Sequence, residues 1–110
     1  MQNGHWLLAL ENQTAVGCVW YENRGDYMYL GRLAVPPEFR GRGIANQLMQ
    51  AVEERARAEN VLRVHLGVRV VLEKMRTMYE RRGYRVIRYE THAGYAEPTY
   101  LIMEKTLNGV

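Results

Sequence analysis

Two glycines placed between two arginines are the residues of this chain whose types and spacing could do chemistry. Arg40, Gly41, Arg42 and Gly43 follow an apolar run and a double proline, and they stand where an amphipathic segment begins. Glycine permits backbone conformations and close approaches that a Cβ forbids, so successive amide N–H groups can point at one ligand beside the guanidinium groups. The pattern predicts an anion-binding loop at the start of a helix, suited to a pyrophosphate.

Strands and a helix must position this loop. Residues 5–11 and 15–22 are rich in β-branched, aromatic and aliphatic side chains with turn residues between them, which predicts a β-hairpin. Residues 27–35 predict a third antiparallel strand, which the double proline ends. Apolar residues then recur at helical spacing over residues 44–59, which predicts a helix whose polar face includes Glu53.

The second half of the chain predicts one more helix and three more strands. In chain order these are a strand at 61–68, a helix at 72–82 and closing strands at 84–91 and 99–105. The strands on either side of the first helix must run parallel through a right-handed crossover. The order β-β-β-α-β-α-β-β predicts an α+β fold, an α/β sandwich with a mixed, mostly antiparallel sheet, and one domain over residues 1–110.

Composition narrows the class of protein. Hydrophobic residues make up 47% and charged residues 25% of the chain, and no window approaches the roughly 18 apolar residues of a membrane span, so we expect a cytoplasmic protein without a membrane partner. The net charge is +3, and the basic residues are spread along the chain, which does not favour nucleic acid as a partner. His5 and His65 lack partners at metal-ligand spacing, so both are expected to be structural, with no metal site.

The spacing of Gly41 and Gly43 can be compared with known classes of phosphate-binding loop. The nucleoside-triphosphate loop needs a Gly-Lys pair, which this chain lacks, and that class is excluded. The dinucleotide fingerprint requires a small third residue where Asn46 stands, and it follows a different strand arrangement. A tight strand-to-helix turn, with glycines for packing and arginines for solubility, remains as a purely structural alternative.

Residues 40–45 resemble the Arg/Gln-x-x-Gly-x-Gly/Ala motif of the GNAT superfamily of N-acetyltransferases, in which this loop holds the pyrophosphate of acetyl-CoA. Residues 33–35 resemble the bulged strand before that loop. Residues 79–84 are similar to the family's Tyr-Glu-x-x-Gly-Phe block, and the element order matches the family from its second strand onward. The resemblance implies an acyl-CoA N-acyltransferase-like fold, with acetyl-CoA as co-substrate.

The resemblance also implies roles for particular residues. Those expected to contact acetyl-CoA are Leu33, Ala34, Val35, Arg40, Gly41, Arg42, Gly43, Ile44 and Ala45. Backbone groups of the bulge would polarise the thioester carbonyl, and Tyr79 would hydrogen-bond to or protonate the departing thiolate. A tyrosine on the apolar face of a helix is also typical of a hydrophobic core, and that alternative stays open.

The acceptor side is less well defined. Many relatives carry Glu or His near positions 29–31, where this chain has no carboxylate or imidazole, so the resemblance supplies no general base. Tyr29 and, between the last two strands, His92, Tyr95 and Glu97 are the candidates for contacting the acceptor. The family's usual first strand and two helices have no counterpart here, so we expect an open acceptor site, completed by a second subunit of a homodimer or filled by a large acceptor.

Two functions from different classes follow. The first is an N-acetyltransferase that moves an acetyl group from acetyl-CoA to a primary amine of a small molecule or a protein. The second is a non-catalytic CoA-binding or regulatory domain of the same fold. A small nucleic-acid-binding domain, suggested by a pI near 9.2, is a third and weaker alternative.

Overall fold

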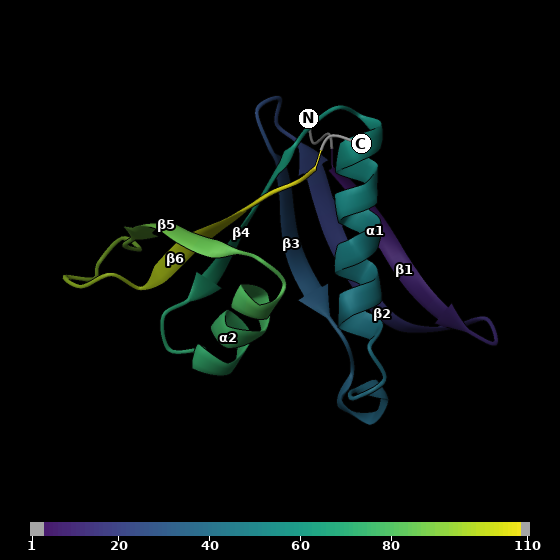
Figure 1. Ribbon diagram of the computed structural model, residues 1–110. Helices are drawn as coiled ribbons and strands as arrows, with labels where there is room; N and C mark the ends of the chain where they lie inside the picture. The colour runs from purple at the N-terminus through teal and green to yellow at the C-terminus, as the bar shows by residue number, and fades with distance from the viewer. Residues whose placement is uncertain (1–3, 109–110) are drawn as a thin grey trace.

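Six strands form one mixed sheet in the order β1-β2-β3-β4-β6-β5 in the computed structural model, which describes residues 4–108 (Figure 1). The strands are β1 (Gly4–Glu11), β2 (Thr14–Asn23), β3 (Met28–Ala34), β4 (Arg63–Arg69), β5 (Arg85–Glu90) and β6 (Tyr100–Thr106). The helices are α1 (Ile44–Ala58) and α2 (Glu73–Arg81), with a short 3-10 turn η1 (Pro37–Phe39) before α1. This arrangement confirms the predicted α+β fold and the order of its elements.

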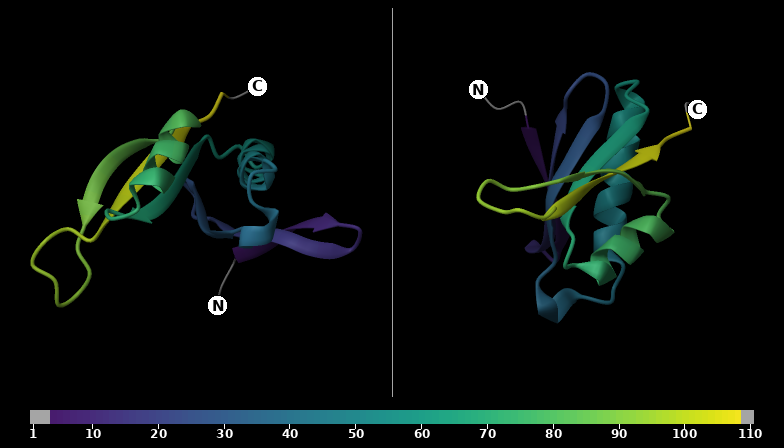
Figure 2. Two further views of the ribbon diagram at one scale, coloured as in Figure 1. Left: turned by 90° about the horizontal axis from the view of Figure 1, so that it is seen from below. Right: turned by 90° about the vertical axis from the view of Figure 1, so that its left-hand side faces the viewer.

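The sheet is divided between β3 and β4. Neighbouring strands on either side of this junction are antiparallel, whereas β3 and β4 are parallel, as the crossover required. They pair only at Met28 with Val64 and at Tyr29 with His65. Beyond these pairs the two strands diverge toward their C-terminal ends (Figure 1), which leaves a gap in the sheet. Figure 2 shows the two halves turned relative to each other, with α1 over the first and α2 beside the second.

Alternation along the strands separates the two faces of the sheet. Met28 and Leu30 of β3 and Val64 and Leu66 of β4 are buried in one hydrophobic cluster with residues of α1. The α1 members of this cluster are Ile44, Leu48, Met49, Val52 and Ala56, which repeat at helical spacing as the sequence predicted. The intervening residues of β3 and β4 therefore face away from α1.

Glu53 corrects the predicted polar face of α1. The prediction placed it toward solvent, but its side chain is only 3% exposed. Its carboxylate accepts hydrogen bonds from Arg82 Nη2 at 3.1 Å, Lys105 Nζ at 3.0 Å and the Tyr84 hydroxyl at 3.0 Å. A buried charge is tolerated when partners of this kind surround it. Burial and the carboxylate raise the pKa of Tyr84, which keeps its hydroxyl a donor.

Replacement of Glu53 tests this network. We expect Glu53→Ala to lower the free energy of unfolding by about 3–5 kcal/mol, because it leaves two cations and a buried hydroxyl without their acceptor. Urea denaturation measures the change. Glu54→Ala is the matched control. It removes an exposed carboxylate one residue away, which accepts a long hydrogen bond of 3.4 Å from Gln50, and it should change stability by less than about 0.5 kcal/mol. Equal losses in the two variants would contradict the assignment.

Candidate functional site

A groove of about 790 Å³ lies between the end of β3, the start of α1 and α2. We call it the loop groove. Its lining contains Leu33, Ala34, Val35, Arg40, Gly41, Gly43, Ile44 and Ala45, together with Asn46, Met75 and Met78 from the two helices and Pro36 and Phe39 from the connecting turn. Eight of the nine residues expected to contact acetyl-CoA are thus brought together in one groove.

The two glycines of the loop have the backbone geometry that the sequence predicted. Gly41 has φ of 83° and Gly43 has φ of 78°, both in the left-handed region that side chains disfavour. A Cβ at either position would meet no protein atom within 4 Å, so packing does not explain the choice of glycine. Gly43 is the N-cap of α1, and no side chain among residues 4–108 caps the start of this helix, which leaves first-turn N–H groups without an acceptor from those side chains.

The two arginines of the loop take different directions. Arg40 lines the groove, and its Nε donates a 3.0 Å hydrogen bond to the carbonyl of Val35, which ties the loop to the end of β3. Arg42 does not line the groove. Its guanidinium pairs with Glu11 of β1 at 3.1 Å and lies over the ring of Phe39, 5.4 Å from the centroid. The structure therefore places the side chain of Arg40, and not that of Arg42, in the loop groove.

A bulge interrupts β3 before the loop. Trp20 of β2 pairs with Gly31, but Cys18, two residues earlier on β2, pairs with Ala34, three residues further along β3. Arg32 lies inside this interval with φ of 54°, an uncommon value for a residue with a side chain. The bulge therefore begins before the predicted residues 33–35 and ends within them.

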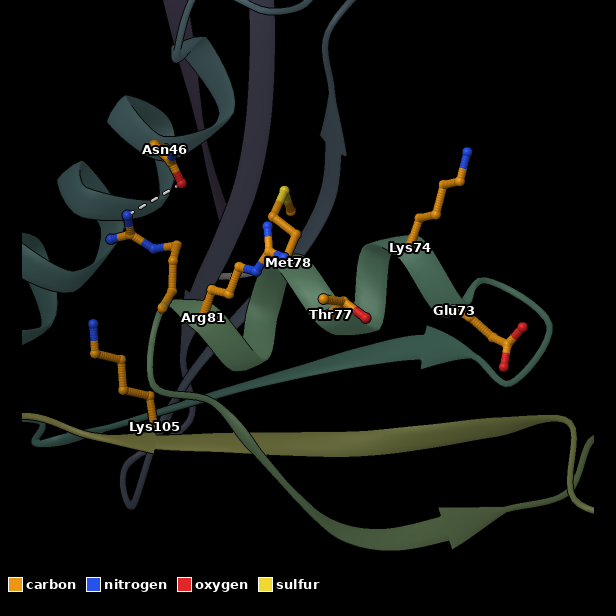
Figure 3. Close-up of a pocket in the computed structure, with 8 residues that line it drawn as sticks. Asn46, Glu73, Lys74, Thr77, Met78, Arg81 and Lys105 are labelled. Carbon is orange, nitrogen blue, oxygen red and sulfur yellow. Dashed lines mark hydrogen bonds between the residues drawn. The ribbon is translucent and has the colours of Figure 1, made fainter.

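A second groove, of about 820 Å³, adjoins the first along α2 and shares Asn46 and Met78 with it. Figure 3 shows this basic groove, with Lys74 and Arg81 on α2 and Lys105 on β6. Arg82 also lines it and donates to Asn46 Oδ1 at 3.4 Å. The sequence analysis did not single out this cluster: Lys74, Arg81 and Arg82 come from one segment of the chain, and the distant Lys105 joins them only because β6 lies beside α2.

The phenols of Tyr79 and Tyr29 approach the gap between β3 and β4 from opposite faces of the sheet. Tyr79 of α2 is 4% exposed, and its ring meets that of Tyr84 edge-on at 6.1 Å between centroids. Burial raises the pKa of Tyr79 to about 12, and nearby Tyr29 adds to the shift. Tyr29 extends from β3 toward β4, with its hydroxyl 3.4 Å from the position that a Cβ on Gly67 would occupy. Tyr79 is therefore protonated at neutral pH and can donate a hydrogen bond.

A third pocket, of about 570 Å³, opens on the face of the sheet away from α1, and we call it the open-face pocket. Tyr29, Gly31, His65, Gly67, Tyr100 and Ile102 are among the residues that line it. His65, expected to be structural, hydrogen-bonds through Nε2 to Glu104 Oε2 at 3.0 Å, and Tyr27 stacks on its ring at 3.9 Å. The hydrogen bond from His65 lowers the pKa of Glu104; burial opposes this effect and Arg85 supports it.

The other three acceptor-side candidates lie in the β5–β6 loop and do not line the open-face pocket. His92 packs on Tyr100, with 4.6 Å between ring centroids, and its backbone N–H donates to the Thr99 hydroxyl at 2.9 Å. Tyr95 and Glu97 are exposed at the surface of the loop. Of the four candidates, the structure brings only Tyr29 into this pocket.

Within residues 4–108 there is no cluster of three or more His, Cys, Asp or Glu side chains able to hold a metal ion. In the same part of the chain, neither helix is long and apolar enough to cross a membrane.

Comparison with known proteins identifies the family. The model of the acetyltransferase (GNAT) family matches residues 1–84, and the chain belongs to this family. An acetyltransferase of Pectobacterium atrosepticum is 39% identical over 85 residues, which cover 74% of this chain and 58% of that protein. The matched part thus spans less than two thirds of this relative.

Solved structures share the fold over nearly the whole chain. A GNAT family acetyltransferase from Elizabethkingia anophelis with acetyl-CoA bound superposes with a TM-score of 0.85 at 19% identity, covering 96% of this chain and 77% of that one. The PaiA N-acetyltransferase from Thermoplasma acidophilum, in complex with coenzyme A, gives a TM-score of 0.79 at 23% identity, covering 94% and 61%. These two proteins of the same fold hold acetyl-CoA and coenzyme A, respectively.

The hydrogen bond between His65 and Glu104 makes the free energy of unfolding depend on pH in the acid range. Because the folded pKa of Glu104 is lowered from 4.5, its contribution to stability is complete above that value and is lost as pH falls below it, through the folded pKa. We expect Glu104→Gln to flatten the acid side of a plot of unfolding free energy against pH. Glu97→Gln, in the exposed loop, should leave the plot unchanged. An identical acid slope in wild type and Glu104→Gln would contradict this assignment.

Proposed function

We propose that the protein is an N-acetyltransferase that uses acetyl-CoA to acetylate a primary amine. The observation that carries the proposal is the loop groove, where two left-handed glycines, uncapped helix N–H groups and Arg40 line one space. Structures of the same fold from Elizabethkingia anophelis and Thermoplasma acidophilum contain acetyl-CoA and coenzyme A, respectively, which supports the same ligand for this chain.

The grooves suit the parts of coenzyme A. The pyrophosphate binds the N–H groups of residues 41–45, where the partial positive charge of the α1 N-terminus and the guanidinium of Arg40 complement two negative phosphates. The third phosphate, on the ribose, lies in the adjoining basic groove near Lys74 and Arg81. Neither cation has an ion-pair partner among residues 4–108, so both are available to a phosphate.

The thioester then reaches the gap between β3 and β4. Backbone groups freed by the bulge bind the pantetheine arm and polarise the acetyl carbonyl. The amine nitrogen forms a bond to the acetyl carbon while the C–S bond breaks, and Tyr79 donates a hydrogen bond to the thiolate. Full proton transfer from a phenol of pKa about 12 to a thiolate of about 8.5 is uphill by about 5 kcal/mol, so hydrogen bonding is the role of Tyr79.

A CoA-binding domain without turnover is the alternative of a different class. It predicts tight binding of acetyl-CoA with no release of thiol in the presence of any amine. The enzyme predicts thiol release that depends on both substrates. Both functions therefore use the loop groove to bind acetyl-CoA, and they differ in whether the acetyl group is transferred at the gap between β3 and β4.

Substitution of Gly43 by Glu tests the donor site. We expect acetyl-CoA to bind on the order of tenfold to a hundredfold more weakly, because a carboxylate at the loop repels the pyrophosphate. Isothermal titration calorimetry measures the dissociation constant. Gly43→Gln separates charge from backbone strain, since it has the same shape without the charge.

Gly25→Glu is the matched control for this substitution. Gly25 also has a positive φ, of 91°, with no atom near its Cβ position, but it lies in the β2–β3 turn. This variant should bind acetyl-CoA like wild type. Unchanged affinity in Gly43→Glu would overturn the placement of the pyrophosphate and, with it, the proposed function.

Tyr79→Phe tests the leaving-group role. We expect kcat to fall on the order of a hundredfold, with little change in acetyl-CoA affinity, because the lost hydrogen bond forms to the thiolate as it departs. Thiol release at saturating acetyl-CoA measures kcat. Tyr89→Phe, on β5 with a 53% exposed side chain, is the control and should keep wild-type turnover. Undiminished kcat in Tyr79→Phe would make Tyr79 a core residue only.

A further inference from the structure

His65 is held rigidly in the open-face pocket. Its side chain is 11% exposed, Tyr27 stacks on its ring with an interplanar angle of 10°, and Glu104 fixes Nε2 from the neighbouring strand. Glu104 itself is 12% exposed and also accepts a 3.4 Å bond from Arg85. The ring therefore has one orientation, set by contacts on its face and on one nitrogen.

The second nitrogen of His65 is available. An ionised carboxylate can only accept hydrogen bonds, so Nε2 carries the proton that is donated to Glu104. In the neutral ring, Nδ1 then bears a lone pair, and no residue among 4–108 hydrogen-bonds to it. A carboxylate that orients imidazole while the other nitrogen faces a pocket is the arrangement expected of a general base.

The reaction of the proposed function needs such a group. An alkylamine of pKa about 10.4 is only about one part in 2,500 neutral at pH 7, and its nitrogen must lose a proton to become an amide. His65 on β4 pairs in register with Tyr29 on β3. The hydroxyl of Tyr29 lies beside Gly67, at the gap between the two strands. Both side chains line the pocket on the face opposite Tyr79. An amine in the open-face pocket would thus approach the thioester from the side of His65.

We propose that the open-face pocket is the site of the acceptor amine, that His65 is the catalytic base, and that Glu104 is its positioning residue. This inference rests on the proposed function. As the amine nitrogen attacks the acetyl carbon, its proton passes to Nδ1, directly or through one water, and the C–S electron pair leaves on the thiolate. The imidazolium then returns its proton to solvent, so the protein is unchanged after each turnover.

Other charged and titratable groups surround this pair. Those that line the pocket or act on Glu104 are Arg24 and Tyr27 from the β2–β3 turn, Tyr29 and Arg32 from β3, Arg63 from β4, Arg85, Arg88 and Glu90 from β5, and Tyr100 from β6. Arg24 pairs with Glu22, and Arg88 pairs with Glu90. Glu104 is the only carboxylate among residues 4–108 that hydrogen-bonds to His65.

A pH–rate profile tests the inference, with phenethylamine as the probe acceptor. For wild type we expect a plot of log kcat/KM for the amine against pH to have a slope of 2 at acid pH. One unit of slope comes from deprotonation of the amine and one from deprotonation of His65. His65→Gln should lower kcat/KM by about a hundredfold or more at neutral pH and reduce the slope to 1. Glu104→Gln should lower kcat/KM but keep the slope of 2, because His65 remains while the imidazolium that forms loses its counter-charge. A slope of 2 in His65→Gln would overturn the assignment.

His5→Gln is the matched control. His5 also packs on a tyrosine, Tyr21, at 5.4 Å between ring centroids, but it lies on β1 outside the pocket. Its substitution should leave both rate and slope unchanged. A slope change of equal size in His5→Gln would show that the effect on the profile is general and would overturn the role of His65.

An NMR measurement tests the same pair without any acceptor. The chain has three histidines, so nitrogen-15 labelling with His65→Gln as the assignment variant isolates the ring of His65. We expect the tautomer with hydrogen on Nε2 in wild type; hydrogen on Nδ1 would overturn the proposal.

Calorimetry with acetyl-CoA distinguishes failure of the His65 assignment from failure of the proposed function. Binding with an unchanged slope in His65→Gln refutes only the base, whereas absence of binding refutes the proposed function.

Discussion

The buried carboxylate of Glu53 joins the two halves of the protein on the helix-covered side of the sheet. The sheet alone joins them weakly, because β3 and β4 pair at only two positions before they diverge. Glu53 belongs to α1, which packs on the first half, and its donors Arg82, Tyr84 and Lys105 all belong to the second. Because a buried charge that loses its partners is strongly unfavourable, this contact fixes the position of α1 relative to β5 and β6.

The same contact supports the gap in the sheet. A ladder that continued along β3 and β4 would close the space into which Tyr29 and Tyr79 project. With the halves joined through Glu53, the strands can separate and still keep a defined distance. Tyr84 links the two features directly, since its hydroxyl binds Glu53 and its ring packs edge-on against Tyr79. The position of the proposed leaving-group donor thus depends on a carboxylate outside the site.

The features predicted correctly are those with a local signal. The helix expected at 44–59 is found at Ile44–Ala58, because its apolar residues repeat at the helical period. The glycines at 41 and 43 adopt left-handed conformations, as their position before a helix indicated. The resemblance to the GNAT superfamily depended on the same local motifs, and the family match confirms it.

The features that were missed depend on residues far apart in the chain. The donors to Glu53 lie 29 to 52 residues away from it, and Glu104 lies 39 residues from His65. Periodicity alone assigns a glutamate to the solvent face and leaves a strand histidine without a partner. Arg42 points out of the loop groove for a similar reason, since its partner Glu11 stands on the distant first strand. Only the register of the strands and the packing of the helices bring these groups together.

Alternation along β3 and β4 also allows the two faces of the sheet to change independently. Residues 28, 30, 64 and 66 fill the core, whereas residues 29, 31, 65 and 67 line the open-face pocket. A substitution in the second set alters the pocket without removing a side chain from the core. Apart from the proposed base His65, residues on the pocket side of these strands can therefore be exchanged while those on the core side are kept. A small domain of this design can acquire a new small-molecule preference through few substitutions and with little loss of stability.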